Sequence, residues 1–353
     1  MTDLDTVARA ATRELLERTT PDVGSRYREL RRLRGRRTAA KVASVGAVAA
    51  LAIGGWPLGG DSRPGQLEPA PPAPPAPQVQ VHVTNGTLVA ARPAGGSYDR
   101  VAVMGPQLAN LPVVGKGHAA LQFVGDGASA VYDTGTGQLG VVDLATGESS
   151  RLVDCPDGNC DGSLSPDGTT VAYPRGGDVL TLQDVVSGET HDLSVEAPGP
   201  LATPSWSPDG RSLAFAAVDG IYTIGADGGA LRKLHSSRVM LGGTSVAWSP
   251  DGSRVAFFDI RRAGADGSVL AFTAMTVGRD GENPVSVHDA GQCVCINRPR
   301  PSLTWSPDGT LLAVASTTMS SGMGVHTVRP DGADWQLRLG GYFASLAWQP
   351  VIE

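Results

Sequence analysis

Aromatic residues are scarce in this sequence, where Phe, Trp and Tyr together make up 5% of 353 residues. The apolar residues lie mainly in short runs of Val, Leu, Ala and Ile, which favours many short strands over a few long helices. Gly and Pro are abundant by contrast, with 46 and 26 residues, which is rich in turns but below the level of a disordered polymer. We therefore expect an all-β protein.

Linear motifs for catalysis are also absent. There is no G-x-S-x-G nucleophile elbow, and the six His residues are scattered, with no two at the spacing of metal ligands. The sequence therefore predicts no catalytic residue, no metal site and no cofactor, and we expect the chain not to be an enzyme.

The charges divide the chain into a basic head and an acidic body. Residues 1–41 hold eleven Lys or Arg against six Asp or Glu, so the remainder carries a formal charge of −11 within the total of −6. A basic head could bind nucleic acid or a membrane surface. Tyr27 is the one aromatic residue among these arginines, so the head has few side chains that could stack on bases. We therefore expect no nucleic-acid partner.

An uncharged, mainly apolar run follows the basic head at residues 42–58. By the positive-inside rule, it predicts a single transmembrane helix with residues 1–41, including a short amphipathic helix, in the cytoplasm and everything after it outside. We expect an uncleaved signal-anchor in the plasma membrane. A secretory peptide cleaved near residues 50–52 and a soluble protein with a buried Ala-rich helix are the alternatives.

A Pro-rich linker comes next, at residues 59–78. Seven prolines lie between residues 61 and 80, and such a segment prefers an extended polyproline II form to a packed one. It is predicted to be a spacer between the membrane and the domain formed by residues 79–353.

An internal repeat dominates that domain. The pentapeptide Trp-Ser-Pro-Asp-Gly begins at Trp206, Trp248 and Trp305, a copy without Trp begins at Ser165, and a last one is cut short after Trp348. Successive Asp residues are mostly about 42 residues apart, which is the length of a four-stranded propeller blade. Pro fixes φ, Asp bonds its own backbone and Gly takes positive φ. The turn residues are Asp167, Gly168, Asp209, Gly210, Asp251, Gly252, Asp308 and Gly309.

Five such blades fit between residue 121 and residue 344. Residues 79–104 supply three further strands, including a hairpin at Asn85-Gly86, and residues 345–350 supply one strand without a blade. Joined, the two ends are predicted to complete a sixth blade and close the ring, which removes the exposed sheet edges.

The Trp-Ser-Pro-Asp-Gly repeat followed by an apolar strand resembles the TolB-like, WD-type propeller repeat of bacterial proteins. The resemblance covers residues 79–353 and implies periplasmic or cell-surface binding to proteins or wall components. The layout of a short basic head and one anchor is also similar to anti-sigma regulators. However, the head contains no His and no Cys, so the zinc-bound anti-sigma motif is absent.

Four cysteines form two local pairs, Cys155 with Cys160 and Cys293 with Cys295. Local structural disulfides are expected outside the cytoplasm, while a four-Cys zinc site and free or redox-active thiols are alternatives. One blade contains about 15 additional residues, divided between residues 261–267 and the segment around residues 293–300. Because insertions commonly form loops, Arg298 and Arg300 are candidates for a binding loop or for a solvated decoration.

The sequence thus favours a membrane-anchored, extracytoplasmic binding or scaffold module for an envelope protein or a cell-wall component. A transmembrane regulator that acts through the cytoplasmic head is one alternative. A propeller hydrolase or lyase, with residues scattered around the axis, is the other. Composition rich in Ala, Arg, Gly and Pro suggests an actinobacterial source.

Overall fold

The computed structural model describes residues 83–95, 97–112, 121–125, 127–155, 162–236, 246–263, 269–293, 302–316 and 323–352. The predicted head, transmembrane helix and Pro-rich linker lie outside these residues. Within the described residues, no helix is both long and apolar enough to cross a membrane.

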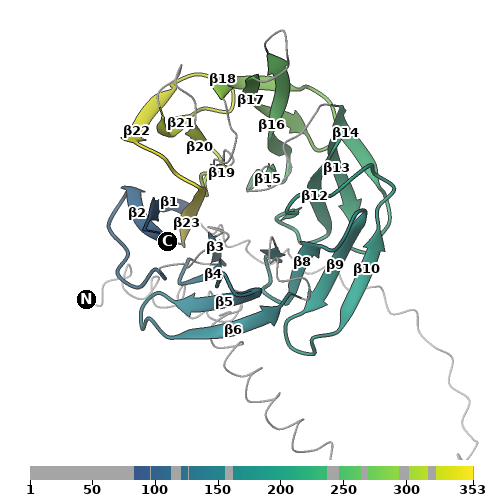
Figure 1. Cartoon of the computed structure of the whole chain (residues 1–353), viewed down its shortest axis with the longest axis horizontal. Helices are drawn as coiled ribbons and strands as arrows, with labels where there is room; N and C mark the ends of the chain where they lie inside the picture. The colour runs from purple at the N-terminus through teal and green to yellow at the C-terminus, as the bar shows by residue number, and fades with distance from the viewer. Residues whose placement is uncertain are drawn as a thin grey trace, which may run out of the picture.

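The described residues form six antiparallel sheets arranged in a ring around a central axis (Figure 1). Five sheets contain four consecutive strands, and the first strand of each lies nearest the axis. Blade I comprises β3 (Leu121–Val124), β4 (Ser129–Asp133), β5 (Gln138–Asp143) and β6 (Ser149–Asp154). Blade II comprises β7 (Ser163–Leu164), β8 (Thr170–Pro174), β9 (Val179–Asp184) and β10 (Thr190–Ser194).

Blades III to V repeat this order around the ring. Blade III comprises β11 (Ser205–Trp206), β12 (Ser212–Ala217), β13 (Gly220–Gly225) and β14 (Arg232–Ser236). Blade IV comprises β15 (Val246–Trp248), β16 (Arg254–Ala263), β17 (Val269–Gly278) and β18 (Val285–Cys293). Blade V comprises β19 (Ser302–Trp305), β20 (Leu312–Ser316), β21 (Gly324–Val328) and β22 (Gln336–Gly340). The all-β six-bladed propeller predicted from the repeat is confirmed.

The closing blade joins the two ends of the domain. Its inner strand is β23 (Ser345–Ile352), which pairs with β1 (Val83–Ala94), and β1 pairs in turn with β2 (Ser97–Met104). The hairpin predicted at Asn85-Gly86 is wrong, because β1 runs through both residues with only a shift of register against β23. Residues 83–104 therefore form two strands here.

The side chain of Asn85 explains why no turn forms there. Its Nδ2 donates to Asp308 Oδ2 (2.8 Å), and its Oδ1 accepts from the backbone N–H of Asp308 (3.2 Å). An Asn-Gly pair usually favours a two-residue hairpin. In this protein the Asn85 side-chain amide instead binds the turn of blade V, the neighbour of the closing blade.

The inserted residues of blade IV also differ from the prediction. Residues 261–263 belong to β16, which pairs with β17 along its whole length from Arg254↔Gly278 to Ala263↔Val269. The insertion therefore lengthens a hairpin and does not form a loop at these positions. Arg298 and Arg300 lie outside the described residues.

The hydrophobic core is divided among the junctions between blades. Six clusters of buried side chains are found in the described residues, and each contains residues of two neighbouring blades. The junction between blade V and the closing blade, for example, buries Val325 and Phe343 with Leu88 and Trp348. Because each blade packs on both neighbours, an open ring would expose the buried side chains of one of these junctions.

Candidate functional site

The four best-preserved repeats form the same turn between the first and second strands of their blades. In blade III, Ser207 Oγ donates to Asp209 Oδ1 (2.6 Å) and accepts from the backbone N–H of Ser212 (2.9 Å). Asp209 Oδ1 also accepts from the backbone N–H of Arg211 (3.1 Å), and Gly210 has a φ of 68°. Ser, Asp and Gly therefore each have a structural role in this turn.

Acid is expected to weaken these turns. The Ser207 hydroxyl and the Arg211 N–H lower the pKa of Asp209 below its ordinary value. A carboxyl with a lowered folded-state pKa contributes stability above its unfolded pKa and loses it as pH falls through the folded pKa. Asp209→Asn should therefore unfold at a lower temperature than the parent near pH 7, and the difference should disappear at the acidic end of a pH 7 to pH 2 series. A difference that stays constant with pH would contradict this assignment.

A continuous set of hydrogen bonds runs around the axis through the six inner strands, and the bond that closes it ends on the turn after β3. The side chain of Gln122 in β3 both donates to and accepts from the backbone of Leu164 in β7 (3.0 Å each), and Trp206 Nε1 donates to Ser163 O (3.1 Å). The remaining junctions are bridged in the same way. The bonds are Trp248 N to Ser205 Oγ (3.2 Å), Trp305 Nε1 to Ala247 O (3.1 Å), Leu346 N to Ser302 Oγ (3.2 Å) and Gln349 Nε2 to Gly127 O (2.9 Å).

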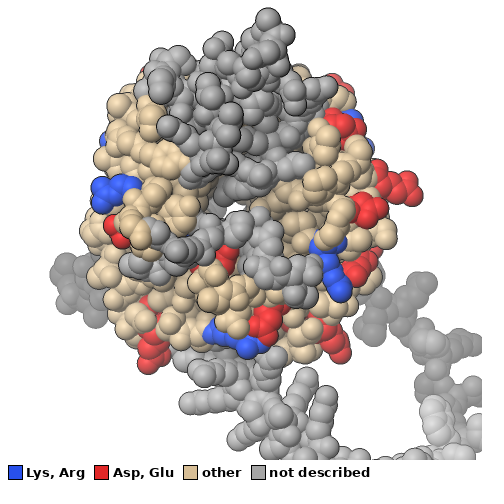
Figure 2. Space-filling view, viewed as in Figure 1, with Lys and Arg blue, Asp and Glu red and all other residues tan. Residues whose placement is uncertain are grey.

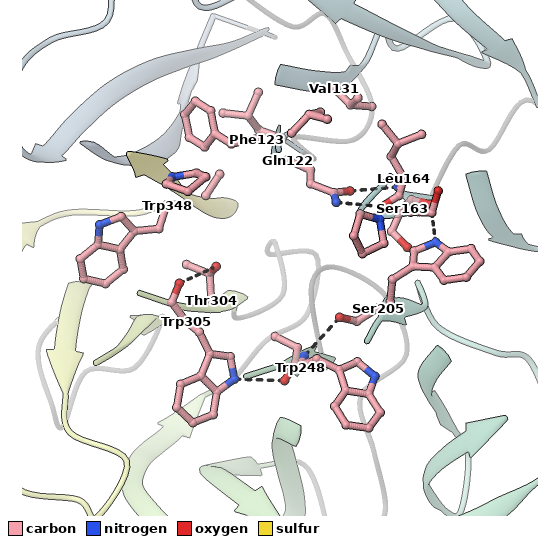
Figure 3. A pocket seen from close by; sticks show the side chains of 18 of the residues that line it. Gln122, Phe123, Val131, Ser163, Leu164, Ser205, Trp248, Thr304, Trp305 and Trp348 are labelled. Atoms are coloured by element: carbon pink, nitrogen blue, oxygen red, sulfur yellow. Dashed lines mark hydrogen bonds between the residues drawn. The ribbon is translucent and has the colours of Figure 1, made fainter. Parts of the chain in front are cut away.

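The indole N–H groups of the repeat tryptophans are not equivalent. Trp206, Trp305 and Trp348 each donate to a backbone carbonyl, the last to Gly86 O (3.2 Å). Trp248 Nε1 is buried and has no hydrogen-bond partner among the residues that the structure describes. In Figure 3 the indoles of Trp248, Trp305 and Trp348 all point away from the axis, so the difference arises at the junction between blades and not in the central opening.

A Trp→Phe series should reveal this difference. At Trp305 the change leaves Ala247 O without its donor, which should cost about 1–3 kcal/mol in addition to the loss of the indole ring's packing. At Trp248 the same change removes a buried donor with no partner in the described part of the chain, so the free energy of unfolding should fall by clearly less. Urea unfolding of both variants measures the free energy that each loses, and each variant is the size-matched control for the other. Equal losses of free energy would contradict the difference between the two tryptophans.

The inner strands surround an axial pocket with a volume of about 530 Å³ (Figure 3). Its wall contains one equivalent residue from each blade. This residue lies four positions before the repeat Asp, or before the residue that takes the place of that Asp. These residues are Gln122, Ser163, Ser205, Ala247, Thr304 and Ala347. The prolines at the Pro position of the repeat also line the pocket, namely Pro166, Pro208, Pro250 and Pro307 in turns and Pro350 in β23. The pocket wall is therefore built by the repeat itself.

The pocket is largely apolar and uncharged. Among its described lining residues the one charged side chain is Asp133, which is 2% exposed and accepts from the backbone N–H of Gly135 (2.7 Å). In the view of Figure 2, the charged side chains of the described residues lie mostly toward the outer part of the molecule. Such a wall suits recognition by shape, apolar contact and neutral hydrogen bonds.

The residues singled out from the sequence lie mostly outside this pocket. The repeat aspartates lie in the turns and do not line the pocket, namely Asp167, Asp209, Asp251 and Asp308. In blade II both the Ser and the Pro before the Asp line the pocket. In blades III to V, of these two residues only the Pro lines it. Within the described residues, no three His, Cys, Asp or Glu side chains are gathered as metal ligands. The pocket residues escaped the sequence prediction because their types differ from blade to blade, although their fixed distance from the repeat Asp would have identified them.

The cysteines can be followed only in part. Cys155 is buried and disulfide-bonded. Cys160 and Cys295 lie outside the described residues, and Cys293 is the last residue of β18. The local pairing of Cys155 with Cys160 and of Cys293 with Cys295 stays a prediction.

Two of the scattered histidines meet in the fold. The rings of His288 and His326 both stack on Trp335, at centroid distances of 3.5 Å and 4.4 Å. His288 belongs to blade IV and His326 to blade V, so this group joins two blades. Their separation in the sequence gave no signal of this contact.

Comparison with solved structures identifies the type of propeller. TolB from Acinetobacter baumannii superposes with a TM-score of 0.54 at 16% identity, over 75% of this chain and 66% of that one. A putative TolB from Agrobacterium tumefaciens superposes with a TM-score of 0.53 at 16% identity, over 78% of this chain and 99% of that one. The propeller is TolB-like. No family model matches the sequence, so the likeness is one of fold.

The first of these comparisons spans just under two thirds of the length of the Acinetobacter protein. At this level of identity, the TolB-like fold places the blades and the axial pocket, but the side chains that line the pocket belong to this chain. Function must therefore be inferred from those side chains.

Proposed function

We propose that this TolB-like propeller is a membrane-anchored binding or scaffold module, which holds part of an envelope protein or a cell-wall component in its axial pocket. The pocket of about 530 Å³ carries the proposal, because its lining offers shape and neutral contacts with a single, internally bonded carboxylate among the described residues. Acid–base catalysis would need further titratable groups there. The module acts outside the cytoplasm, with the basic head inside.

The pocket assignment can be tested with a photo-crosslinking amino acid at Thr304, which lines the pocket, and at Val218, which is 44% exposed between β12 and β13. In intact cells, the Thr304 position should yield one dominant cross-linked envelope component, and Thr304→Arg should reduce copurification of that component. The Val218 position and Val218→Arg are the matched controls. Equal cross-linking from both positions would overturn the pocket as the binding site.

The anchoring is tested separately by protease accessibility in intact cells and in inverted vesicles, with both termini tagged. The propeller should be cut only from outside the cell and the head only from the cytoplasmic side. A propeller that is cut only in inverted vesicles would overturn the orientation and the envelope partner together.

A further inference from the structure

The propeller begins beside its own axial pocket. β1 starts at Val83, which is the first described residue and one of the residues that line the pocket. Two residues later, the Asn85 side chain binds Asp308 in the repeat turn of blade V, so β1 starts at the end of the ring that carries the repeat turns. The prolines of these turns line the pocket at the same end. Residues 1–82 therefore join the propeller next to the pocket.

The longer gaps between described residues are flanked by residues at the opposite end of the ring. Each repeat turn follows an inner strand, so the inner strands run toward the turn end and begin at the other one. Four gaps come shortly before an inner strand, namely residues 113–120, 156–161, 237–245 and 294–301. Two more connect the second strand of a blade to the third, namely residues 264–268 and 317–322. The N-terminal segment is thus the candidate within this chain for filling the pocket from the turn end.

Residues 69–77 are the part of the N-terminal segment whose chemistry fits such a pocket. Their sequence, Pro-Ala-Pro-Pro-Ala-Pro-Pro-Ala-Pro, contains six prolines and no charged residue. Proline has no backbone N–H, so the segment offers nine carbonyl acceptors and only three backbone donors. A Pro-rich segment is also extended before it binds, so binding costs little conformational entropy. It needs a neutral wall that donates hydrogen bonds.

The pocket wall contains hydroxyl groups that can donate such bonds (Figure 3). Ser163 Oγ is buried and has no hydrogen-bond partner among the described residues. Ser205 Oγ accepts from the backbone N–H of Trp248 (3.2 Å), and within the described part of the chain its own hydrogen has no acceptor. Thr304 Oγ1 donates to Trp305 O across a long 3.5 Å. Because each hydroxyl can donate one bond, these three groups can bind backbone carbonyls of a Pro-rich segment.

Residues 69–77 are also close enough to reach the pocket. Five residues separate Pro77 from Val83, and an extended chain covers about 3.3–3.6 Å per residue, so Pro77 can reach any point within about 20 Å of Val83. A segment tethered over such a short distance has an effective concentration in the millimolar range. An intrinsic dissociation constant of about 0.1 mM is then sufficient to fill the pocket in about nine chains out of ten.

We propose that residues 69–77 occupy the axial pocket of their own chain and are displaced when the envelope partner binds. The displacement rests on the partner binding proposed above, whereas the occupancy rests on the pocket and the Pro-rich segment alone. A partner binds more weakly when only a fraction of the chains has an open pocket. If about one chain in ten is open, the apparent affinity of the partner falls about tenfold. The Pro-rich linker is then an autoinhibitory segment as well as a spacer.

The photo-crosslinking amino acid at Thr304, placed in the full-length chain in intact cells, tests the occupancy. Mass spectrometry should find a cross-link from position 304 to residues 69–77 of the same chain. The same amino acid at Val218, which is 44% exposed, is the control and should give no such link. Two copies with different tags, expressed together, separate links within one chain from links between chains.

A replacement of residues 69–77 by a Gly/Ser sequence of the same length tests whether the prolines are needed. The internal cross-link should fall to less than about half, and the yield of the external envelope component should rise at least about twofold. The same replacement at residues 59–67 is the matched control. It leaves residues 69–77 and their distance from Val83 unchanged, so both yields should stay at the level of the parent.

The occupancy is overturned by any of three results: no link from position 304 to residues 69–77, an equally strong internal link in the Gly/Ser variant, or links between differently tagged copies only. An external cross-link obtained together with one of these results leaves the proposed partner in place. An internal link that the Gly/Ser replacement removes, with no external component from either chain, supports the occupancy and overturns the partner. An external yield that does not rise when the internal link is lost overturns the displacement.

Discussion

Deleting residues 345–353, which include the whole of β23, is expected to unfold the entire propeller. The strand pairs with β1, and its side chains Leu346 (3% exposed) and Trp348 (6%) are buried. Loss of such core side chains costs about 2–5 kcal/mol each, so the sum approaches the about 5–15 kcal/mol that stabilises a typical domain. Circular dichroism should show no cooperative thermal transition in the truncated chain.

A shorter deletion provides the control for this experiment. Removing residues 351–353 takes away Val351, which is 37% exposed, and leaves Leu346 and Trp348 in place. This variant should keep a cooperative transition at a somewhat lower temperature. If the longer deletion also unfolds cooperatively near the parent's temperature, the ring does not depend on closure by β23.

Gly127→Ala is expected to be among the most destabilising single substitutions. A Cβ at this position would lie 2.2 Å from the backbone oxygen of Pro350, at the junction between blade I and the closing blade, and φ is +79°. The left-handed conformation alone costs an alanine about 1–2 kcal/mol. The contact with a backbone atom forces the two blades apart, so the total loss should be about 3 kcal/mol or more.

Gly210→Ala is the matched control for this substitution. It has a similar φ of +68°, but the nearest atom to its Cβ is Pro166 Cδ at 3.9 Å. It should therefore lose only the conformational part, about 1–2 kcal/mol. Urea unfolding of the two variants separates strain from steric overlap, and equal losses would show that closure tolerates a wider spacing between blades.

Much of the fold followed from the repeat. Ser207, Pro208, Asp209 and Gly210 encode one tight turn through local bonds, and a period of about 42 residues leaves room for four strands. Local chemistry of this kind can be read from one segment of sequence, because donor and acceptor are separated by two to five residues. The number of blades then followed from counting turns and pairing the two ends.

The errors arose where pairing between strands decides the structure of a segment. Asn85-Gly86 carries the signal of a hairpin, yet β23 pairs with this segment from more than 250 residues away and Asp308 binds the Asn85 side chain. The insertion in blade IV was expected to form loops, but residues 261–263 continue β16 against β17. In the first case a distant strand outweighed the local preference, and in the second the next strand in the chain extended the hairpin through residues expected to form a loop.

By itself, the sequence determined the all-β class, the turn chemistry and the closed ring of six blades, because each depends on residues close together or on a regular period. Tertiary structure alone decided that the inner strands enclose a pocket, that Trp248 Nε1 has no hydrogen-bond partner among the described residues, and that the closing blade has three described strands. These features depend on how six inner strands converge and on what covers each sheet. Gln122 and Trp248 occupy regular positions of the repeat, but the contacts that each side chain makes depend on the neighbouring blade.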